Sequence, residues 1–245
     1  GRTSEEYAKF RDIYPTEFYN KIAMKCEIES GMRFLDVGTG TGVIPRNMHC
    51  FGGDWTGVDI SENQIEEARK MSEGLNIKYL VSSAENMDFA DNSFDIITAC
   101  QCFWYFDHKK TAPLFARILK KNGKLLFLCM EWLPFEDEIA MASEQLVLKY
   151  NPSWSGAGER MHAIKIPDSY KEYFEFSYSE EYRVDVPFTR ESWNGRMKAC
   201  RGIGASLPPD KISEWENEHM ELLDKIAPKS FNIAHYAAIA ELIKK

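Results

Sequence analysis

Between residues 33 and 130 the sequence alternates short apolar runs with amphipathic stretches, and this alternation constrains the fold more than any other feature. The apolar runs cover residues 33–37, 55–59, 77–81, 94–100 and 124–130. Several are apolar almost throughout, which is typical of strands that helices cover on both faces. Strand, helix and strand in repeated succession predict right-handed crossovers and an open, parallel, doubly wound α/β sheet.

Two helices within this stretch carry clear end signals. One is expected over residues 61–72, where Ser61 can cap the start and Gln64 stands three residues later, at the spacing of a capping box. Gly74 is placed to end this helix in a left-handed turn. The other helix is expected over residues 109–120, followed by a turn at Asn122-Gly123 that leads into the fifth strand.

Helices and two further strands are expected to flank this core. One or two aromatic-rich helices precede it within residues 5–29. After it come helices at 135–150, 189–199 and 209–226, a loop at 151–158, and strands at 178–187 and 231–243. No linker is long enough to force a domain boundary. We therefore expect one domain over residues 1–245, with an N-terminal helical lid at 1–30, a core at 31–131, and a substrate-side cap with the last two strands at 132–245.

Composition excludes several classes of protein. The 245 residues are 44% hydrophobic and 13% aromatic, which is too apolar for long disorder and sufficient for a large core. The longest apolar stretches are too short to span a bilayer, and the first residues lack the apolar segment of a signal peptide. A formal charge of −8 disfavours binding to nucleic acid. We expect a cytoplasmic protein, a monomer or homodimer, with a small-molecule partner and no membrane association.

The six cysteines show no metal-binding pattern. None forms a Cys-x-x-Cys pair, and the close pair Cys100 and Cys102 has no His at zinc-ligand spacing. Four of the six lie in or beside apolar runs, where a free Cys behaves as a small buried hydrophobe. We therefore expect reduced structural thiols and no metal site.

A glycine-rich segment follows the first strand directly. It runs D-V-G-T-G-T-G from Asp36 to Gly42, and glycines there let the backbone approach a ligand closely. Its G-x-G-x-G spacing differs from the G-x-G-x-x-G dinucleotide fingerprint, and it lacks the Lys-Ser/Thr of a phosphate-binding P-loop. Asp59 ends the second strand, 21 residues after Gly38, where a carboxylate can accept both hydroxyls of a ribose.

Four motifs in this order resemble one family. They are FLDVGTGTG at 34–42, GVDIS at 57–61, SSAENMDFADNSFD at 82–95 and RILKKNGKLLF at 117–127. The chain thereby resembles the class I S-adenosylmethionine-dependent methyltransferases of the type-11 methyltransferase-domain family, with a distant similarity to trans-aconitate methyltransferase-like proteins. The resemblance implies a Rossmann-like sheet of seven mostly parallel strands, with the last strand inserted antiparallel and a helical insertion after the fifth.

The resemblance also implies S-adenosyl-L-methionine as the cofactor and S-adenosyl-L-homocysteine as its product. The glycine segment would hold the methionine part, Asp59 the ribose, and the turn after the third strand the adenine edge. The end of the fourth strand would meet the methionine ammonium. Ser83 stands where relatives carry Asp. The full set of expected cofactor residues is Asp36, Gly38, Thr39, Gly40, Gly42, Asp59, Ile60, Gln64, Ser83, Ala84, Glu85, Cys100 and Gln101.

A second set of residues is expected to contact the substrate. Segments FRDIYP at 10–15 and QCFWYF at 101–106 are similar to segments of trans-aconitate methyltransferase-like proteins, in which a His stands where this chain has Trp104. Arg196 lies in the motif WNGR, where a guanidinium fork suits a substrate carboxylate and a solvated helix face is the alternative. The expected substrate residues are Tyr7, Arg11, Tyr14, Trp104, Tyr105, His162 and Arg196.

No catalytic pair can be recognised. His108 follows Asp107 at the start of a helix, where solvation or capping is expected, and His235 is expected to be structural. This fits a reaction that needs mainly the aiming of a nucleophile at an activated methyl. We expect an S-adenosylmethionine-dependent methyltransferase (EC 2.1.1.-) acting by in-line displacement on a small-molecule carboxylate or hydroxyl. The alternatives are a cofactor-binding protein without transferase activity and an NAD-dependent oxidoreductase.

Overall fold

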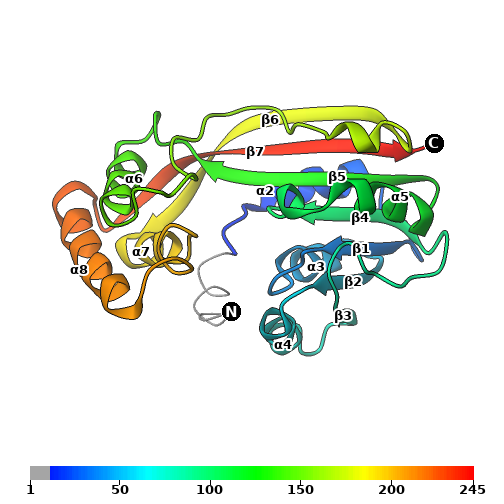
Figure 1. Ribbon diagram of the computed structural model, residues 1–245, viewed down its shortest axis with the longest axis horizontal. Coiled ribbons are helices and arrows are strands. Elements are labelled where there is room, and N and C mark those ends of the chain that lie inside the picture. The colour runs from blue at the N-terminus through cyan, green and yellow to red at the C-terminus, as the bar shows by residue number, and fades with distance from the viewer. Residues whose placement is uncertain (1–11) are drawn as a thin grey trace. The chain divides into compact units, whose positions relative to one another are not determined.

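A seven-stranded sheet organises the chain, with strand order β3-β2-β1-β4-β5-β7-β6 in the computed structural model, which describes residues 12–245. The pairs β3–β2, β2–β1, β1–β4 and β4–β5 are parallel. The arrow of β7 points opposite to those of β5 and β6 (Figure 1). The predicted Rossmann-like α/β fold is thus confirmed. The strands are β1 Arg33–Val37, β2 Asp54–Asp59, β3 Ile77–Val81, β4 Phe94–Cys100, β5 Leu119–Trp132, β6 Phe174–Thr189 and β7 Ser230–Lys244.

The helices follow the expected pattern with shifts of a few residues at their ends. The helix expected at 61–72 is α4, in which Ser61 is the N-cap and its hydroxyl accepts the backbone N–H of Gln64 at 3.4 Å. Gly74 has the left-handed φ of 84° expected after this helix. The helices are α2 Thr16–Cys26, α3 Val43–Met48, α4 Glu62–Met71, α5 His108–Ile118, α6 Glu138–Tyr150, α7 Arg190–Lys198 and α8 Pro209–Ile226, with short 3-10 turns η1 His49–Phe51, η2 Phe103–Tyr105 and η3 Asp168–Tyr170.

The described residues group into two compact units. The sheet unit comprises residues 15–129, 163–181 and 238–245, and it contains β1 to β4, α2 to α5 and part of each long strand β5, β6 and β7. The helical unit comprises residues 12–14, 130–162 and 182–237, and it contains α6, α7, α8 and the remaining parts of those strands. The division of a single domain into lid, core and cap stays a prediction.

The start of the fifth strand differs from the expectation. Strand β5 begins at Leu119, so the turn expected at Asn122-Gly123 lies inside the strand. Phe94 pairs with Leu119 and Ile96 with Lys124, so the register shifts here because β5 carries extra residues between the two pairs. Asn122 takes a left-handed φ of 60°, which a β-bulge can accommodate. The Asn122-Gly123 pair, which predicted a turn before the strand, therefore belongs to a β-bulge within β5.

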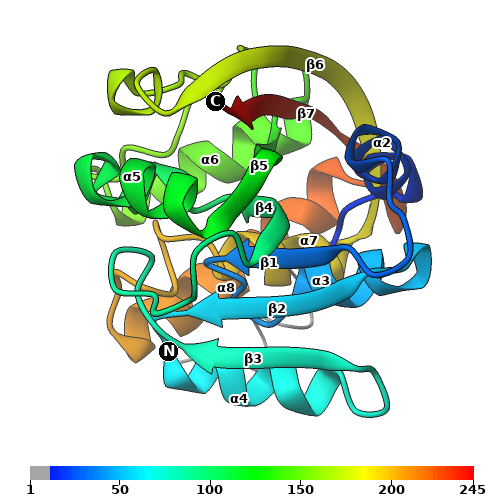
Figure 2. The ribbon, with the colours of Figure 1, turned by 90° about the vertical axis from the view of Figure 1, so that its right-hand side faces the viewer.

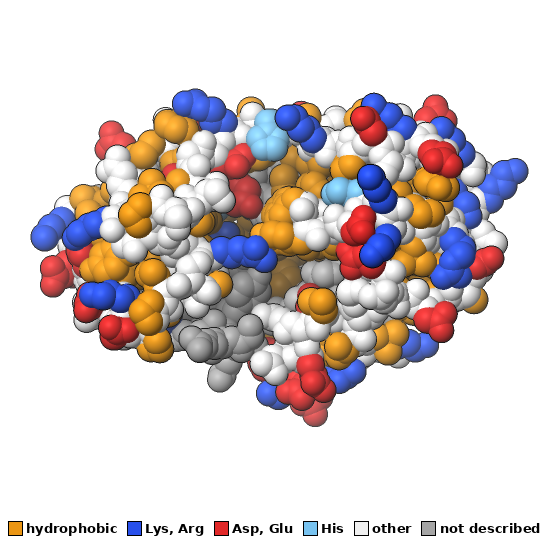
Figure 3. Space-filling view, in the orientation of Figure 1, with side chains coloured by type: hydrophobic (Ala, Val, Ile, Leu, Met, Phe, Trp, Pro, Cys, Tyr) orange, Lys and Arg blue, Asp and Glu red, His pale blue; other side chains and the backbone are white. Residues whose placement is uncertain are grey.

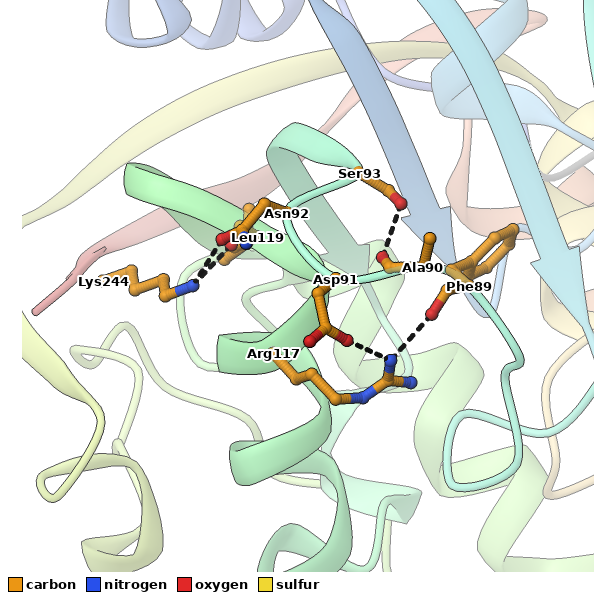
Figure 4. Close-up of polar contacts among 8 residues, drawn as sticks. All are labelled: Phe89, Ala90, Asp91, Asn92, Ser93, Arg117, Leu119 and Lys244. Carbon is orange, nitrogen blue, oxygen red and sulfur yellow. Dashed lines mark hydrogen bonds and ion pairs between the residues drawn. The ribbon is translucent and has the colours of Figure 1, made fainter.

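The loop that leads into β4 is fastened by two basic side chains (Figure 4). Arg117 Nη1 donates to the carbonyl oxygen of Phe89 at 2.8 Å and to Asp91 Oδ1 at 2.7 Å. Lys244 Nζ donates to Asn92 Oδ1 at 3.1 Å. These contacts join α5 and the end of β7 to the loop before β4, and they fix the position at which β4 enters the sheet.

The sheet core is apolar on both faces, as the near-continuous strands predicted. Leu125, Leu126, Phe127 and Leu128 are fully buried in succession along β5. Burial of one such side chain contributes roughly 1.5–3 kcal/mol relative to exposure. The core therefore holds the strand ends at fixed positions, and those ends carry the candidate site.

The surface carries both signs of charge. On the face drawn in Figure 3, Lys and Arg side chains are interspersed with Asp and Glu side chains. That face therefore offers no continuous basic surface for phosphate groups. Within residues 12–245, no helix is long and apolar enough to cross a membrane.

Candidate functional site

The loop after β1 combines a buried carboxyl with three glycines in left-handed conformation. Asp36 is buried at the end of β1, and Thr98 Oγ1 donates to its Oδ1 at 2.6 Å. Burial raises the pKa of this carboxyl to about 7. Gly38, Gly40 and Gly42 have φ values of 70°, 56° and 75°, which side chains rarely tolerate. The G-x-G-x-G spacing thus places a glycine at every left-handed position of this turn.

Two side chains support the glycine loop at close range. A Cβ atom on Gly38 would lie 2.7 Å from the Sγ of Cys102, and one on Gly42 would collide with the hydroxyl of Tyr79. The Tyr79 hydroxyl also bonds the hydroxyl of Ser72 at 2.9 Å. Sequence reasoning missed Cys102 and Tyr79 as supports, because only the folded sheet brings β3 and the residue before η2 against this loop.

Asp59 joins the glycine loop to the start of α4. The backbone N–H of Gly40 donates to Asp59 Oδ2 and that of Ser61 to Oδ1, both at 2.9 Å. Ile60 follows with an apolar side chain that is 75% exposed. The Gln64 Oε1 atom lies 3.8 Å from the position that a Cβ atom would take if Gly40 carried one. These expected residues are therefore neighbours at the end of β2.

The turn after β3 is tied to the segment that leads into α5. Asn86 Nδ2 donates to the Ser83 hydroxyl at 2.9 Å, and Ala84 is buried. Glu85 Oε1 accepts the backbone N–H of Asp107 at 3.0 Å. The expected residues Ser83 and Glu85 therefore have fixed side chains, and Glu85 joins the exits of β3 and β4.

The exit of β4 carries a strained residue and two exposed aromatic rings. Cys100 ends the strand, and Gln101 takes a left-handed φ of 61° while its N–H donates to the Leu128 carbonyl at 2.9 Å. Trp104 and Tyr105 on η2 are 43% and 54% exposed. In Figure 2 the arrowheads of β1, β2 and β3 point to one edge of the sheet. Ligands of open α/β sheets bind outside such a carboxyl edge.

The remaining expected substrate residues are not all in the sheet unit. Tyr14, His162 and Arg196 lie in the helical unit. Tyr7 and Arg11 lie outside the described residues. The sheet unit thus contains the whole expected cofactor set together with Trp104 and Tyr105.

Arg196 and His162 have different environments within the helical unit. Arg196 is 2% exposed, so the alternative of a solvated helix face is wrong. Its guanidinium carbon lies 4.8 Å from the centre of the Trp132 ring, a cation–π contact. His162 Nε2 lies 3.0 Å from Glu159 Oε1, and that oxygen also accepts the Tyr236 hydroxyl at 2.8 Å.

The helical unit also has a hollow that holds none of the expected residues. It has a volume of about 470 Å³ and is lined by residues 187–189, 192 and 230–232. His235 lies buried nearby in β7, and burial lowers its pKa to about 3, in agreement with a structural role. All six cysteines are free thiols, and within residues 12–245 no three His, Cys, Asp or Glu side chains gather as metal ligands.

Comparison with known proteins identifies a matching family and similar sequences. Residues 35–127 match the family described as Methyltransferase domain. The ubiquinone/menaquinone biosynthesis C-methyltransferase UbiE of Desulfotalea psychrophila is 32% identical over 123 residues, which cover 47% of this chain and 48% of the relative. The uncharacterized methyltransferase YcgJ of Bacillus subtilis is 31% identical over 106 residues, 42% of each chain. The chain thus matches less than half the length of these two curated relatives.

Solved structures share the fold over most of the chain. The crystal structure of YcgJ matches 94% of this chain and 99% of its own, with a TM-score of 0.55 and 21% identity. The crystal structure of the [4+2]-cyclase SpnF matches 93% of this chain and 80% of its own, with a TM-score of 0.56 and 19% identity. At these identities the likeness shows a common fold, which different chemistries can use.

Proposed function

We propose that this chain, whose residues 35–127 match the family described as Methyltransferase domain, transfers the methyl group of S-adenosyl-L-methionine to a small-molecule acceptor. The observation that carries the proposal is a pair of hydrogen bonds from the backbone N–H groups of Gly40 and Ser61 to Asp59. These bonds orient one carboxylate between the glycine loop and the start of α4. The acceptor that we propose is a carboxylate or a hydroxyl compound.

The residues at the carboxyl edge fit the adenosyl group by their chemistry. Each Asp59 oxygen accepts one backbone N–H, and a carboxylate oxygen has a second lone pair that can accept a ribose hydroxyl. The exposed apolar side chain of Ile60 offers a surface for adenine. Gly38 and Gly40, without Cβ atoms, let the methionine part approach the backbone.

The chain's own part in the reaction is to bind, orient and exclude water. Bound S-adenosylmethionine supplies an activated methyl group on a sulfonium. Holding that group and an acceptor in line accounts for roughly 7–11 kcal/mol of the barrier in well-oriented reactions. The exposed rings of Trp104 and Tyr105 present π faces that attract a sulfonium charge.

For a carboxylate acceptor, we propose Arg196 as the binding residue, assisted by His162 and Tyr14. The chemistry of the side chain supports this role, since a planar guanidinium can pair with a carboxylate through two parallel hydrogen bonds. The formal charge of −8 and the mixed charges in Figure 3 support a small molecule over nucleic acid. The cytoplasmic location and the monomeric or homodimeric state belong to the same proposal.

The test is release of S-adenosylhomocysteine during incubation with S-adenosylmethionine and panels of carboxylic acids, phenols and alcohols. We expect turnover of at least one compound. For a carboxylic acid, Arg196→Met should lower kcat/KM by about 10- to 100-fold, the loss of one charge-assisted contact. Its affinity for S-adenosylhomocysteine should stay that of the wild type. The matched control is Arg183→Met, in the same unit, whose guanidinium pairs with Glu136 at the surface.

A cofactor-binding protein without transferase activity is the second candidate function. The fold shared with the [4+2]-cyclase SpnF supports this second candidate, because that fold also occurs in a protein that is not named a methyltransferase. Binding of S-adenosylmethionine without methyl transfer to any acceptor class would favour this candidate over the first.

A further inference from the structure

The side chain of Tyr79 on β3 reaches across β2 to the glycine loop that follows β1. Strand β2 lies between β3 and β1 in the sheet (Figure 2). In the register of these parallel strands, Tyr79 lies beside Gly57 of β2, and Gly57 lies beside Asp36 of β1. Because Gly57 has no side chain, the Tyr79 ring can pass over β2 at this point.

Gly57 is a glycine for a reason of packing. Its backbone has the ordinary conformation of a strand, which other residues also adopt. An added Cβ atom would lie 2.8 Å from Cδ1 and 2.8 Å from Cε1 of the Tyr79 ring, and 2.8 Å from Oγ1 of Thr39. The space that a side chain would take at Gly57 is therefore occupied by the Tyr79 ring and by a hydroxyl of the glycine loop.

The hydroxyl of Tyr79 lies between the glycine loop and the end of α4. An added Cβ atom on Gly42 would collide with this hydroxyl, so the backbone of Gly42 packs directly against it. The same hydroxyl forms a hydrogen bond of 2.9 Å with the hydroxyl of Ser72, the C-cap residue of α4. Tyr79 and Ser72 are both buried, so water does not compete for this bond.

Helix α4 also holds the rest of Tyr79. Ile65 and Ala68 form a buried cluster with the Tyr79 side chain. Arg69 Nη2 donates to the backbone carbonyl oxygen of Tyr79 at 2.9 Å. A close-packed interior of this kind transmits small displacements from one side chain to the next. The ring is thus fixed by packing and its hydroxyl by Ser72.

We propose that Tyr79, held by Ser72, is a positioning residue for the adenosyl cofactor, because its hydroxyl keeps the glycine loop in its binding conformation at Gly42. This rests on the proposed function, in which that loop holds the methionine part of S-adenosylmethionine. Tyr79 and Ser72 act through the loop and touch no part of the cofactor. A loop that is already in its binding conformation loses less entropy when the ligand arrives, so the loss of this hydroxyl pair weakens binding.

The first test measures the glycine loop without any ligand. The backbone N–H of Gly42 donates to the carbonyl oxygen of Thr39 at 2.9 Å, so its exchange with heavy water reports local opening of the loop. In ¹H–¹⁵N spectra, Ser72→Ala and Tyr79→Phe should each accelerate exchange of the Gly42 amide by about 2- to 10-fold, the fold-change that corresponds to one hydrogen bond.

The matched control for both tests is Ser93→Ala. Ser93 is as buried as Ser72, and its hydroxyl bonds a carbonyl oxygen in the loop before β4. This variant therefore controls for a general loss of stability, and exchange of its Gly42 amide should be that of the wild type. If the Gly42 amide exchanges at the wild-type rate in Ser72→Ala and in Tyr79→Phe, the proposal is overturned.

The second test measures affinity for S-adenosylhomocysteine by titration calorimetry. Ser72→Ala and Tyr79→Phe should each weaken binding by about 2- to 10-fold. The double variant should bind as weakly as either single variant, because both changes remove the same bond. Ser93→Ala should bind as the wild type even where urea unfolding shows an equal loss of stability, which separates positioning from a purely structural role.

Two results of the second test would overturn the proposal. They are wild-type affinity in Ser72→Ala and losses that add in the double variant. A wild-type protein that binds no S-adenosylhomocysteine overturns the proposed function instead, while exchange of the Gly42 amide still decides whether Tyr79 holds the loop.

Discussion

The backbone N–H of Gly40 donates to Oδ2 of Asp59 at 2.9 Å, so one carboxylate is shared by the loop after β1 and the end of β2. The second oxygen takes the N–H of Ser61 at the start of α4. The carboxylate is therefore oriented by the protein itself. A group held in its binding orientation loses less entropy when a ligand arrives, which improves affinity.

Replacing Asp59 tests the role of this carboxylate. Asp59→Ala should weaken binding of S-adenosylhomocysteine by about 1–3 kcal/mol, because it removes the side chain proposed to accept the ribose hydroxyls. Titration calorimetry on the folded variant measures the loss. The matched control is Asp54→Ala at the exposed start of the same strand, which should bind as the wild type. If Asp59→Ala binds S-adenosylhomocysteine as tightly as the wild type, the proposed contact between Asp59 and the ribose is wrong.

A second prediction separates backbone strain from collision at the glycine loop. Gly42 and Gly74 have similar left-handed φ values of 75° and 84°. Of the two, only Gly42 would place an added Cβ atom against Tyr79, whereas a Cβ on Gly74 would have nothing within 4 Å. Gly74→Ala should therefore cost about 1–2 kcal/mol of unfolding free energy for its conformation alone. Gly42→Ala should cost more, measured by urea unfolding, and should also weaken S-adenosylhomocysteine binding. Equal costs for the two variants would contradict the close support by Tyr79.

The raised pKa of Asp36 predicts a pH dependence of stability. In the native state this carboxyl holds its proton up to about pH 7, whereas the unfolded chain releases it near the ordinary value of 3.8. The unfolded state thus binds fewer protons in this window, so the contribution of Asp36 is present below pH 3.8 and is lost as pH rises toward 7. The slope is at most about 1.4 kcal/mol per pH unit.

Asp36→Asn isolates this contribution, since the amide does not titrate. The unfolding free energy of the wild type minus that of the variant should decrease from pH 4 to pH 7, measured by urea unfolding at several pH values. A difference that stays constant over this window would mean that Asp36 is ionised in the native state.

His219 predicts the opposite slope. It is buried between Asn194 Oδ1, at 2.8 Å, and Ser143 Oγ, at 3.0 Å, and burial lowers its pKa to about 3. The unfolded chain takes up a proton below pH 6.5 that the native state refuses, so the contribution of His219 is lost as pH falls from 6.5 toward 3. His219→Gln should therefore flatten the acid limb of the stability curve, which urea unfolding at several pH values measures.

Local chemistry made much of this fold predictable. The helix cap at Ser61, the left-handed Gly74 and the three loop glycines follow from the conformations that single residues allow. The start of β5 at Leu119 was not predictable, because the pairing of β4 with β5 overrides the turn preference of Asn122.

Tertiary contacts explain what the sequence could not reveal about the site. The support of the glycine loop by Tyr79 and the burial of Arg196 each join residues far apart in the chain. No spacing rule links such pairs. The residue types that could bind a ligand were therefore visible in the sequence, whereas their supports were not.

The central claim is tested most directly by titration calorimetry of the purified chain with S-adenosylmethionine, S-adenosylhomocysteine and NAD. The account predicts micromolar binding of both adenosyl sulfur compounds and none of NAD, because the G-x-G-x-G loop and Asp59 form the site. Binding of NAD, or of neither sulfur compound, would contradict it.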